Sequence, residues 1–534
     1  MATDAAVPEQ EATAGGFNSR LAILLSAAMF VLVVDTSLMN VSISAVVKDL
    51  NTTASGVQSA IALEALVSAA FILIGGKVGD LIGRKRAYVL GLLAYAVGAL
   101  AMTLAQDLRA IIIFWAIVGG LGASLLLPAM QSLIHGNFEG AAQKRVYAMV
   151  GAASGIAAAI GPLLGGFITT FLSWRVGFLG ELIIIVVVLS GMGMVKEVAY
   201  TGERGIDFVG ALFSILGMGG LVLGILVWEE GGAAVGALLA IGVISLAVLG
   251  WWLVSRKRAG KLALIDADLF RSSHFRLGIT SQMMQQITLG GLMIALPMFL
   301  QMVLEYNALQ AGISMAPLSL SMFAIALVAG RRAGTRRPAA IVRIGFALVA
   351  LGVVLMLPIV PRTDSGLWLA IPLVIAGIGL GLLVSQLNNI TLAPISEERI
   401  SEAAGVNSAG GSFGLSFGLA LAGAVMLGTL ALSFTNLTNA STVLQPEHKQ
   451  EVATALNDDA ELMSNTALDA QLEGQPEEVQ QEIIRINTEA RPLALQFALL
   501  VPLVAALIGL VVSFRLVKLP DIKPSVALEG LAFD

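Results

Sequence analysis

Long hydrophobic runs alternate with short polar segments along the whole chain of 534 residues. Because a helix needs about 20 apolar residues to cross a bilayer, this pattern predicts fourteen membrane-spanning helices. They fall at 21–46, 55–77, 87–106, 109–134, 145–172, 175–195, 208–228, 232–254, 276–303, 308–330, 339–360, 366–393, 405–434 and 492–515. The expected fold is therefore an all-α polytopic membrane protein.

The first run, Leu21 to Val47, follows a polar stretch without a basic region at its start. It is too long for the core of a signal peptide and lacks a small-residue cleavage site. We expect it to remain as the first span.

Positive charge is distributed unevenly over the turns between the predicted spans. The turns after even-numbered spans hold nineteen Lys and Arg residues, and those after odd-numbered spans hold seven. Cationic loops resist translocation, so the richer side is cytoplasmic. The sequence thus predicts that both termini are cytoplasmic and that the protein lies in the inner (plasma) membrane.

The spans group as six, two and six. We expect a tail at 1–19, a six-helix bundle at 20–195, two linker helices with their loops at 196–275, a second bundle at 276–519 and a tail at 520–534. In the second linker loop, the amphipathic piece Leu264 to Phe270 is expected to lie at the membrane interface.

Residues 435–490 interrupt the hydrophobic pattern with eleven acidic and two basic side chains. By parity this stretch is an external loop with some helical character. A solvated cap is one interpretation, and a surface that recruits a partner or substrate is the other.

Composition narrows the classes of function. Hydrophobic residues make up 57% of the chain and charged residues 13%, with a net charge of -5, which is not the profile of a nucleic-acid-binding protein. With no cysteine and three widely spaced histidines, thiolate chemistry and a histidine-rich metal site are not expected. We therefore expect no metal and no cofactor, and we expect the lipid bilayer to surround a monomer.

One polar segment, Gly75 to Arg86, is more constrained than a simple turn. Its glycines permit tight reversal of the chain in a short loop, and Asp80 lies among basic residues with which it could pair. A charged cluster of this kind suits a latch between two conformations. The segment resembles the signature loop between helices 2 and 3 of the major facilitator superfamily. The resemblance implies a gating charge relay of Asp80 and Arg84, with Gly76 and Gly83 as motif positions.

A weaker copy of this segment, Gly330 to Arg337, follows the tenth span and lacks the aspartate. It supports an organisation in two related halves with an asymmetric latch.

Three carboxylates lie inside predicted spans: Asp35, Glu64 and Glu181. Ionisable groups in a membrane are costly and point to function by default. Each of the three could load a proton on one side and release it on the other. The alternative is a static carboxylate that pairs with a neighbour or faces interfacial water.

The surroundings of Asp35 resemble the helix 1 motif of the fourteen-helix drug:proton antiporter branch, in the residues Asp35-Thr36 and Asn40-Val41-Ser42-Ile43. The resemblance implies proton coupling or cation recognition by Asp35. A small-residue pattern in the fifth span is similar to the superfamily's antiporter motif, which implies export, and comprises Gly151, Gly155, Gly161, Pro162, Gly165 and Gly166.

One feature departs from that branch. Relatives usually carry an arginine in helix 4, whereas the matching stretch here, Trp115 to Gly122, has none. Either this protein adjusts its proton site by other means or it does not couple to protons.

Polar or aromatic side chains in several spans could line a central cavity or simply bridge helices. The candidates are Asn40, Gln282, Gln286, Gln386, Asn389 and Phe413.

Three functions remain open from the residues. The first is an exporter of lipophilic or cationic small molecules driven by protons, and the second is an exporter or flippase-like carrier of a lipid, peptide or cell-envelope precursor. The third, an intramembrane enzyme or receptor, is disfavoured because the chain has no H-E-x-x-H, G-x-S-x-G or Walker sequence. We expect that the protein is not an enzyme.

Overall fold

The computed structural model describes residues 18–197, 205–228, 232–331, 337–363, 365–396, 399–459, 468, 472 and 474–520. Within these residues the chain is almost entirely helical and contains no β-strand. Fourteen helical segments are long and apolar enough to cross a membrane, so the predicted number of spans and the fold class are confirmed for the described residues.

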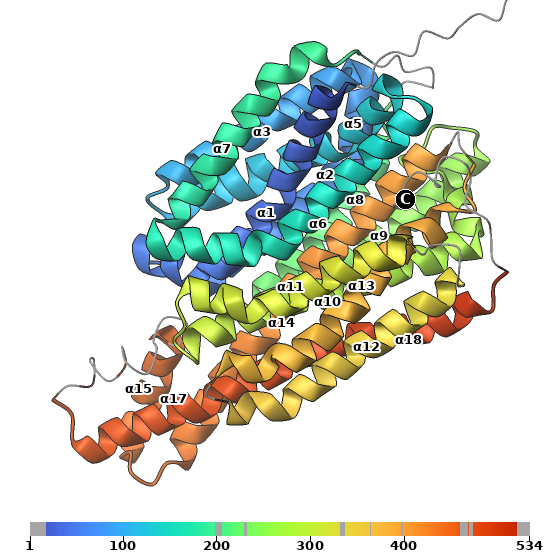
Figure 1. Cartoon of the computed structure of the whole chain (residues 1–534). Coiled ribbons are helices and arrows are strands. Elements are labelled where there is room, and N and C mark those ends of the chain that lie inside the picture. Colours follow the sequence, from blue (N-terminus) through green and yellow to red (C-terminus); the bar gives the residue numbers. More distant parts are fainter. Residues whose placement is uncertain are drawn as a thin grey trace, which may run out of the picture.

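Six spans form the N-terminal bundle, in the upper part of Figure 1. Their bounds are α1 (Ser19–Leu50), α2 (Ala54–Ile82), α3 (Arg84–Leu104), the continuous run α4 (Leu108–Ala110), η1 (Ile111–Gly119) and α5 (Gly120–Asn137), then α6 (Gly140–Phe171) and α7 (Trp174–Ser190), which η2 (Gly191–Met194) extends. Side chains that accept backbone N–H groups fix the first two helix starts: Asn18 caps α1 and Thr53 caps α2.

Two linker helices follow, α8 (Phe208–Leu226) and α9 (Gly232–Arg258), which pack against each other. Asp207 caps α8 and also accepts hydrogen bonds from the Trp252 indole and from the backbone N–H of Leu264. This buried aspartate therefore joins both linker helices to the loop that leads into the second bundle.

The C-terminal bundle begins after the short η4 (Ala267–Arg271). Its spans are α10 (Ser273–Met302), α11 (Ala308–Arg331), α12 (Pro338–Ile359), α13 (Ala370–Leu392) with the preceding turns η5 (Val360–Arg362) and η6 (Gly366–Leu369), α14 (Ile400–Ala440), and the consecutive helices α17 (Glu477–Ala498) and α18 (Leu500–Val517). The helix α15 (Pro446–Asp459) lies between α14 and α17 in the sequence.

The two bundles meet along two antiparallel helix pairs, α2 with α14 and α6 with α11. In Figure 1, α6 and α14 cross the middle of the molecule, where the two bundles meet. The linker helix α8 contacts both α2 and α14, so it covers one of the two seams between the bundles.

The expectation of a short loop at Gly75 to Arg86 was wrong. Helix α2 continues to Ile82, and Gly83 alone separates it from α3. The glycines inside this segment serve packing instead of chain reversal: a Cβ on Gly75 would lie 2.3 Å from the backbone oxygen of Ser124 on α5. Only Gly83, with φ +102°, adopts a backbone conformation that favours glycine.

The segment Leu264 to Phe270, which we predicted to lie at the membrane interface, packs its main apolar side chains against the rest of the protein. Leu264 and Leu269 are buried in a cluster with Phe275 of α10 and Leu392 of α13. Protein side chains, and not lipid, cover this apolar face.

In the predicted external stretch, α14 and α17 extend well beyond the apolar spans and α15 packs against α14. Helix α14 has 41 residues, which at about 1.5 Å per residue makes it roughly 61 Å long, about twice the roughly 30 Å hydrocarbon layer. The helices α15 and α17 project at one end of the molecule (Figure 1).

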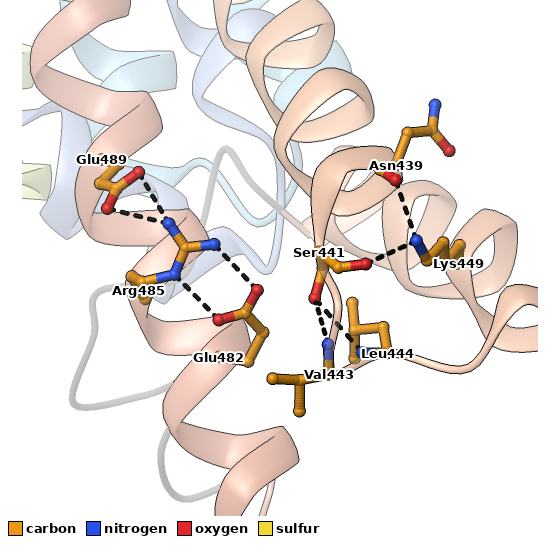
Figure 2. Close-up of polar contacts among 8 residues, drawn as sticks. All are labelled: Asn439, Ser441, Val443, Leu444, Lys449, Glu482, Arg485 and Glu489. Carbon is orange, nitrogen blue, oxygen red and sulfur yellow. Dashed lines mark hydrogen bonds and ion pairs between the residues drawn. The ribbon is translucent and has the colours of Figure 1, made fainter.

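Polar contacts order the projecting region (Figure 2). The guanidinium group of Arg485 lies between the carboxylates of Glu482 and Glu489 on α17. The ammonium group of Lys449 on α15 donates to the carbonyl oxygens of Asn439 and Ser441, at 2.9 and 2.6 Å, and so holds α15 against the end of α14.

Candidate functional site

Asp35 is the most enclosed of the three predicted carboxylates and lies midway along α1, 1% exposed. Both of its oxygens accept a hydrogen bond from the indole Nε1 of Trp115, each at 3.0 Å. The hydroxyl of Tyr95 on α3 donates to Oδ2 of the same carboxyl group. Asp35 thus faces the interior of the N-terminal bundle.

The Trp115 side chain comes from η1, a π-helical segment within the fourth span. π-helical turns are rare and are frequent at functional sites, because the wider coil changes which side chain faces a neighbour. The ring of Phe178 on α7 packs edge-on against the Trp115 ring, with centroids 6.3 Å apart. The indole N–H is held in position by both the segment and this ring.

Glu64 on α2 and Glu181 on α7 are also buried, 8% and 3% exposed. Each lies close enough to Asp35 for the two charges to repel. Both oxygens of Glu181 are buried without a hydrogen-bond partner among the described residues. We refer to these three carboxylates, which are buried in the same bundle on α1, α2 and α7, as the acidic cluster.

The cluster contains no cation partner for its central acid. Among the described residues no Lys or Arg forms an ion pair with Asp35, and no group of acidic or histidine side chains has the geometry to hold a metal ion. Neutral donors surround the carboxyl group, which suits a group that gains and loses a proton.

The sequence interpretation missed Tyr95 and Trp115. The signal was present in part, because Trp115 begins the stretch that departs from the helix 4 motif implied by the resemblance. For Tyr95 no signal exists in the sequence, because only the tertiary fold, in which α3 packs against η1, brings its hydroxyl to Asp35.

The predicted gating residues lie around the turn at Gly83. Asp80 and Arg84 form an ion pair in which both side chains are largely buried. The guanidinium group of Arg84 also donates to the carbonyl oxygen of Gly76 at 3.2 Å. Glu197, after α7, accepts from the backbone N–H of Lys85 at 3.1 Å. The second copy of the segment, Gly330 to Arg337, lies mostly outside the described residues.

The glycines of the fifth span permit two close helix contacts. On one side of α6, Gly161 and Gly165 meet α1 at Ser37 and Leu38. On the other side, Gly155 meets the ring of Phe323 on α11, and Gly166 meets the backbone of Ala308 at the start of that helix. This second side lies on the seam between the bundles.

Two other motif residues occupy the same helix. The carbonyl oxygen of Pro162 lies 2.3 Å from where a Cβ of Gly312 on α11 would be. Gly151 is half-buried, one turn before Gly155.

The predicted cavity residues lie on four different helices, α1, α10, α13 and α14. Gln282 and Gln286 of α10 both face Gly411 of α14, and Gln286 also faces Gly414. Phe413 of the same helix is buried. Gln386 on α13 donates to neighbouring Ser385. Asn40 is buried in the other bundle and Asn389 is half-buried on α13.

Hydrogen bonds close the seam at the end of the molecule that is opposite Gly83. The Ser44 hydroxyl donates to Oε1 of Gln301 at 2.6 Å, joining α1 to α10. The side chain of Gln58 on α2 donates to the carbonyl oxygen of Leu419 on α14 at 3.4 Å. At this end the two bundles are in contact.

The linker loop is attached to the other end of α14. Asp266 pairs with Lys257 and, at 2.5 Å, with Arg399, while its backbone N–H donates to Glu402 of α14 at 2.7 Å. Partial burial works against the charged form of Asp266. Even so, the backbone N–H of Asp268 and the cations of Lys257 and Arg399 hold the pKa of Asp266 below its usual value.

Comparison with known proteins gives consistent matches. The sequence profile of the Major Facilitator Superfamily matches residues 25–197 and 202–419. The puromycin resistance protein pur8 of Streptomyces alboniger is 28% identical over 469 residues, 84% of this chain and 91% of that protein. The quinolone resistance protein NorB of Staphylococcus aureus is 27% identical over 447 residues, 82% of this chain and 92% of that protein. A probable actinorhodin transporter of Streptomyces coelicolor is 27% identical over 425 residues, 78% of this chain and 73% of that protein.

Among solved structures, a bacterial homologue of the human lysosomal transporter Spinster aligns with a TM-score of 0.62 at 13% identity. The alignment covers 94% of this chain and 98% of that one. At this identity the likeness concerns the fold alone.

Proposed function

Because the chain belongs to the Major Facilitator Superfamily, and is a carrier and not an enzyme, we propose that it exports small lipophilic or cationic molecules in exchange for protons. It would act as a multidrug efflux protein of the inner (plasma) membrane, with both termini in the cytoplasm. The names of the relatives, which include puromycin and quinolone resistance proteins, support this class of cargo.

The observation that carries the proposal is the acidic cluster of Asp35, Glu64 and Glu181 inside the N-terminal bundle. Buried carboxylates without a cation partner are unfavourable in the ionised form, so a function is needed to explain their presence. Proton binding and release by Asp35 supplies one.

Alternating access would connect this cluster to the cargo. Cargo binds between the bundles, and the bundles then tilt about the seams of α2 with α14 and α6 with α11. Small residues such as Gly155 and Gly166 let α6 and α11 approach closely, and the pair of Asp80 and Arg84 serves as a latch. Each proton that moves down the membrane potential contributes about 2.3 kcal/mol per 100 mV.

Reconstituted proteoliposomes test the proposal. With an imposed pH gradient, wild-type protein should move a cationic or lipophilic probe, and Asp35→Asn should fold but lose proton-coupled flux. Wild-type flux in Asp35→Asn would refute the role of Asp35, and flux that ignores the pH gradient in the wild type would refute proton antiport.

A second candidate on the same fold is a flippase-like carrier of a lipid, peptide or cell-envelope precursor. The projecting helices α15 and α17 and the missing helix 4 arginine favour it. A deletion strain distinguishes the two: unchanged drug susceptibility with altered envelope lipids supports the second candidate, and increased susceptibility supports the first.

A further inference from the structure

Asp35 has an unusual set of hydrogen-bond partners for a membrane-embedded acid. Its donors are a phenol and an indole, from two different elements, and both are nearly inaccessible: Tyr95 is 4% and Trp115 is 2% exposed. These two side chains therefore supply the side-chain hydrogen bonds of Asp35 in the described part of the chain.

The two donors differ in chemistry. An indole N–H can only donate, so Trp115 always requires an acceptor lone pair on Asp35. A phenol can donate or accept, so Tyr95 donates to the ionised carboxylate and can accept from the protonated acid. One contact is fixed and the other is reversible.

We propose that Tyr95 and Trp115 are the positioning residues of the Asp35 proton site, with Trp115 supplying a neutral donor from the fourth span. This assignment rests on the proton-coupled function proposed above. It answers how a proton site can work here without a neighbouring cation.

The proton step then needs no cofactor. A proton from water binds Oδ2 of Asp35, the Tyr95 O–H rotates away from that oxygen, and the phenol oxygen accepts the new acid proton. No covalent bond of the tyrosine breaks.

Other titratable groups near Asp35 also contribute to the pH dependence of transport. The titratable groups that act on Asp35 and Tyr95 are Glu64 from α2 and Glu181 from α7. Trp115 itself does not titrate. Both carboxylates stay unchanged in the variants described next, so a change in pH dependence reports on the two donors.

The test compares the pH profile of transport in proteoliposomes for Tyr95→Phe and Trp115→Phe. Loss of a donor destabilises the ionised carboxylate relative to the neutral acid. We therefore expect the pH of half-maximal transport to rise by about one unit in each variant. In an Asp35→Asn background the same substitutions should cause no further change in residual flux.

The chain offers a matched control for each variant. Tyr88 lies two turns before Tyr95 on α3 and is fully buried, so Tyr88→Phe removes a buried phenol hydroxyl elsewhere. The Trp252 indole donates to both oxygens of Asp207, at 3.1 and 3.0 Å, so Trp252→Phe removes the same type of bond in the linker. Both controls should keep the wild-type pH profile.

The outcomes separate the two proposals. If the wild type depends on pH and Asp35→Asn abolishes coupling, while Tyr95→Phe and Trp115→Phe keep the wild-type profile, the assignment of the donors is wrong and proton antiport stands. If wild-type flux ignores pH, proton antiport is wrong. Gel filtration checks that each variant folds. If Trp115→Phe does not fold, the comparison of Tyr95→Phe with its control Tyr88→Phe tests the assignment of the donors.

Discussion

Because α6 and α11 are in close contact at Gly166, we predict that the substitution Gly166→Ala forces these two helices apart. The added Cβ would lie 2.5 Å from the carbonyl oxygen of Ala308 and 2.9 Å from the Cα of Leu309. Both are backbone atoms, so no side chain can rotate to make room. The helices must separate there, which opens the seam that this structure holds closed.

The cost of such overpacking is about 1–3 kcal/mol. Alanine also favours a helix more than glycine does. Because α6 is helical whether the seam is closed or open, this gain is the same in both conformations and does not change the ratio between them. An energy of this size changes the ratio of closed to open seam by about 5- to 150-fold. We expect transport to fall because the closed state becomes too rare for the cycle.

Cross-linking measures the population directly, because the natural chain has no cysteine. Cysteines introduced at Ser44 and Gln301, whose side chains are 2.6 Å apart, should react rapidly with a short bifunctional thiol reagent. In Gly166→Ala the rate of cross-linking should fall by the same factor of about 5 to 150.

A control for this prediction is Gly180→Ala, because a Cβ on Gly180 meets no atom within 4 Å. Unchanged cross-linking and transport in Gly166→Ala would show that close approach of α6 and α11 plays no part in the cycle.

The remaining predictions concern charged groups near the membrane surface. Asp80→Asn leaves the largely buried Arg84 without its ion-pair partner, so we expect the free energy of unfolding to fall by about 3–5 kcal/mol in thermal unfolding and transport to be reduced. The exposed Glu489→Gln should cost less than about 1 kcal/mol, and equal effects of the two substitutions would contradict this reasoning. For Asp266, whose folded pKa is lowered, the stabilisation is present above the unfolded pKa of about 3.9 and is lost as the pH falls through the lower folded value. Limited proteolysis of the linker loop should therefore accelerate in acid for the wild type, whereas in Asp266→Asn it should be fast already at neutral pH.

The spans could be predicted because hydrophobic length alone determines which segments cross a bilayer. The acids could be singled out for the same reason: Asp35 and Glu181 are conspicuous in apolar runs. Their partners could not be predicted, since the hydrogen bond from Tyr95 depends on the packing of three helices.

Errors at the segment ends have a physical cause too. Gly75 and Gly79 suggest a turn by composition, yet in the structure they lie within α2, where Gly75 permits contact with α5. The amphipathic segment with Leu264 and Leu269 has an apolar face that could contact either lipid or protein. In the structure this face packs against other side chains of the protein.

The position of α8 gives the molecule two unequal flanks. A lipid-dissolved compound that approaches the junction of α2 and α14 encounters α8, which contacts both. On the other flank, the large apolar side chains Ile156 and Ile160 of α6 and Ile313 and Leu320 of α11 are exposed on the surface, between 37% and 51%. The added helix pair therefore shields one of the two junctions between the bundles from the hydrocarbon layer, whereas α6 and α11 themselves form the surface at the other junction.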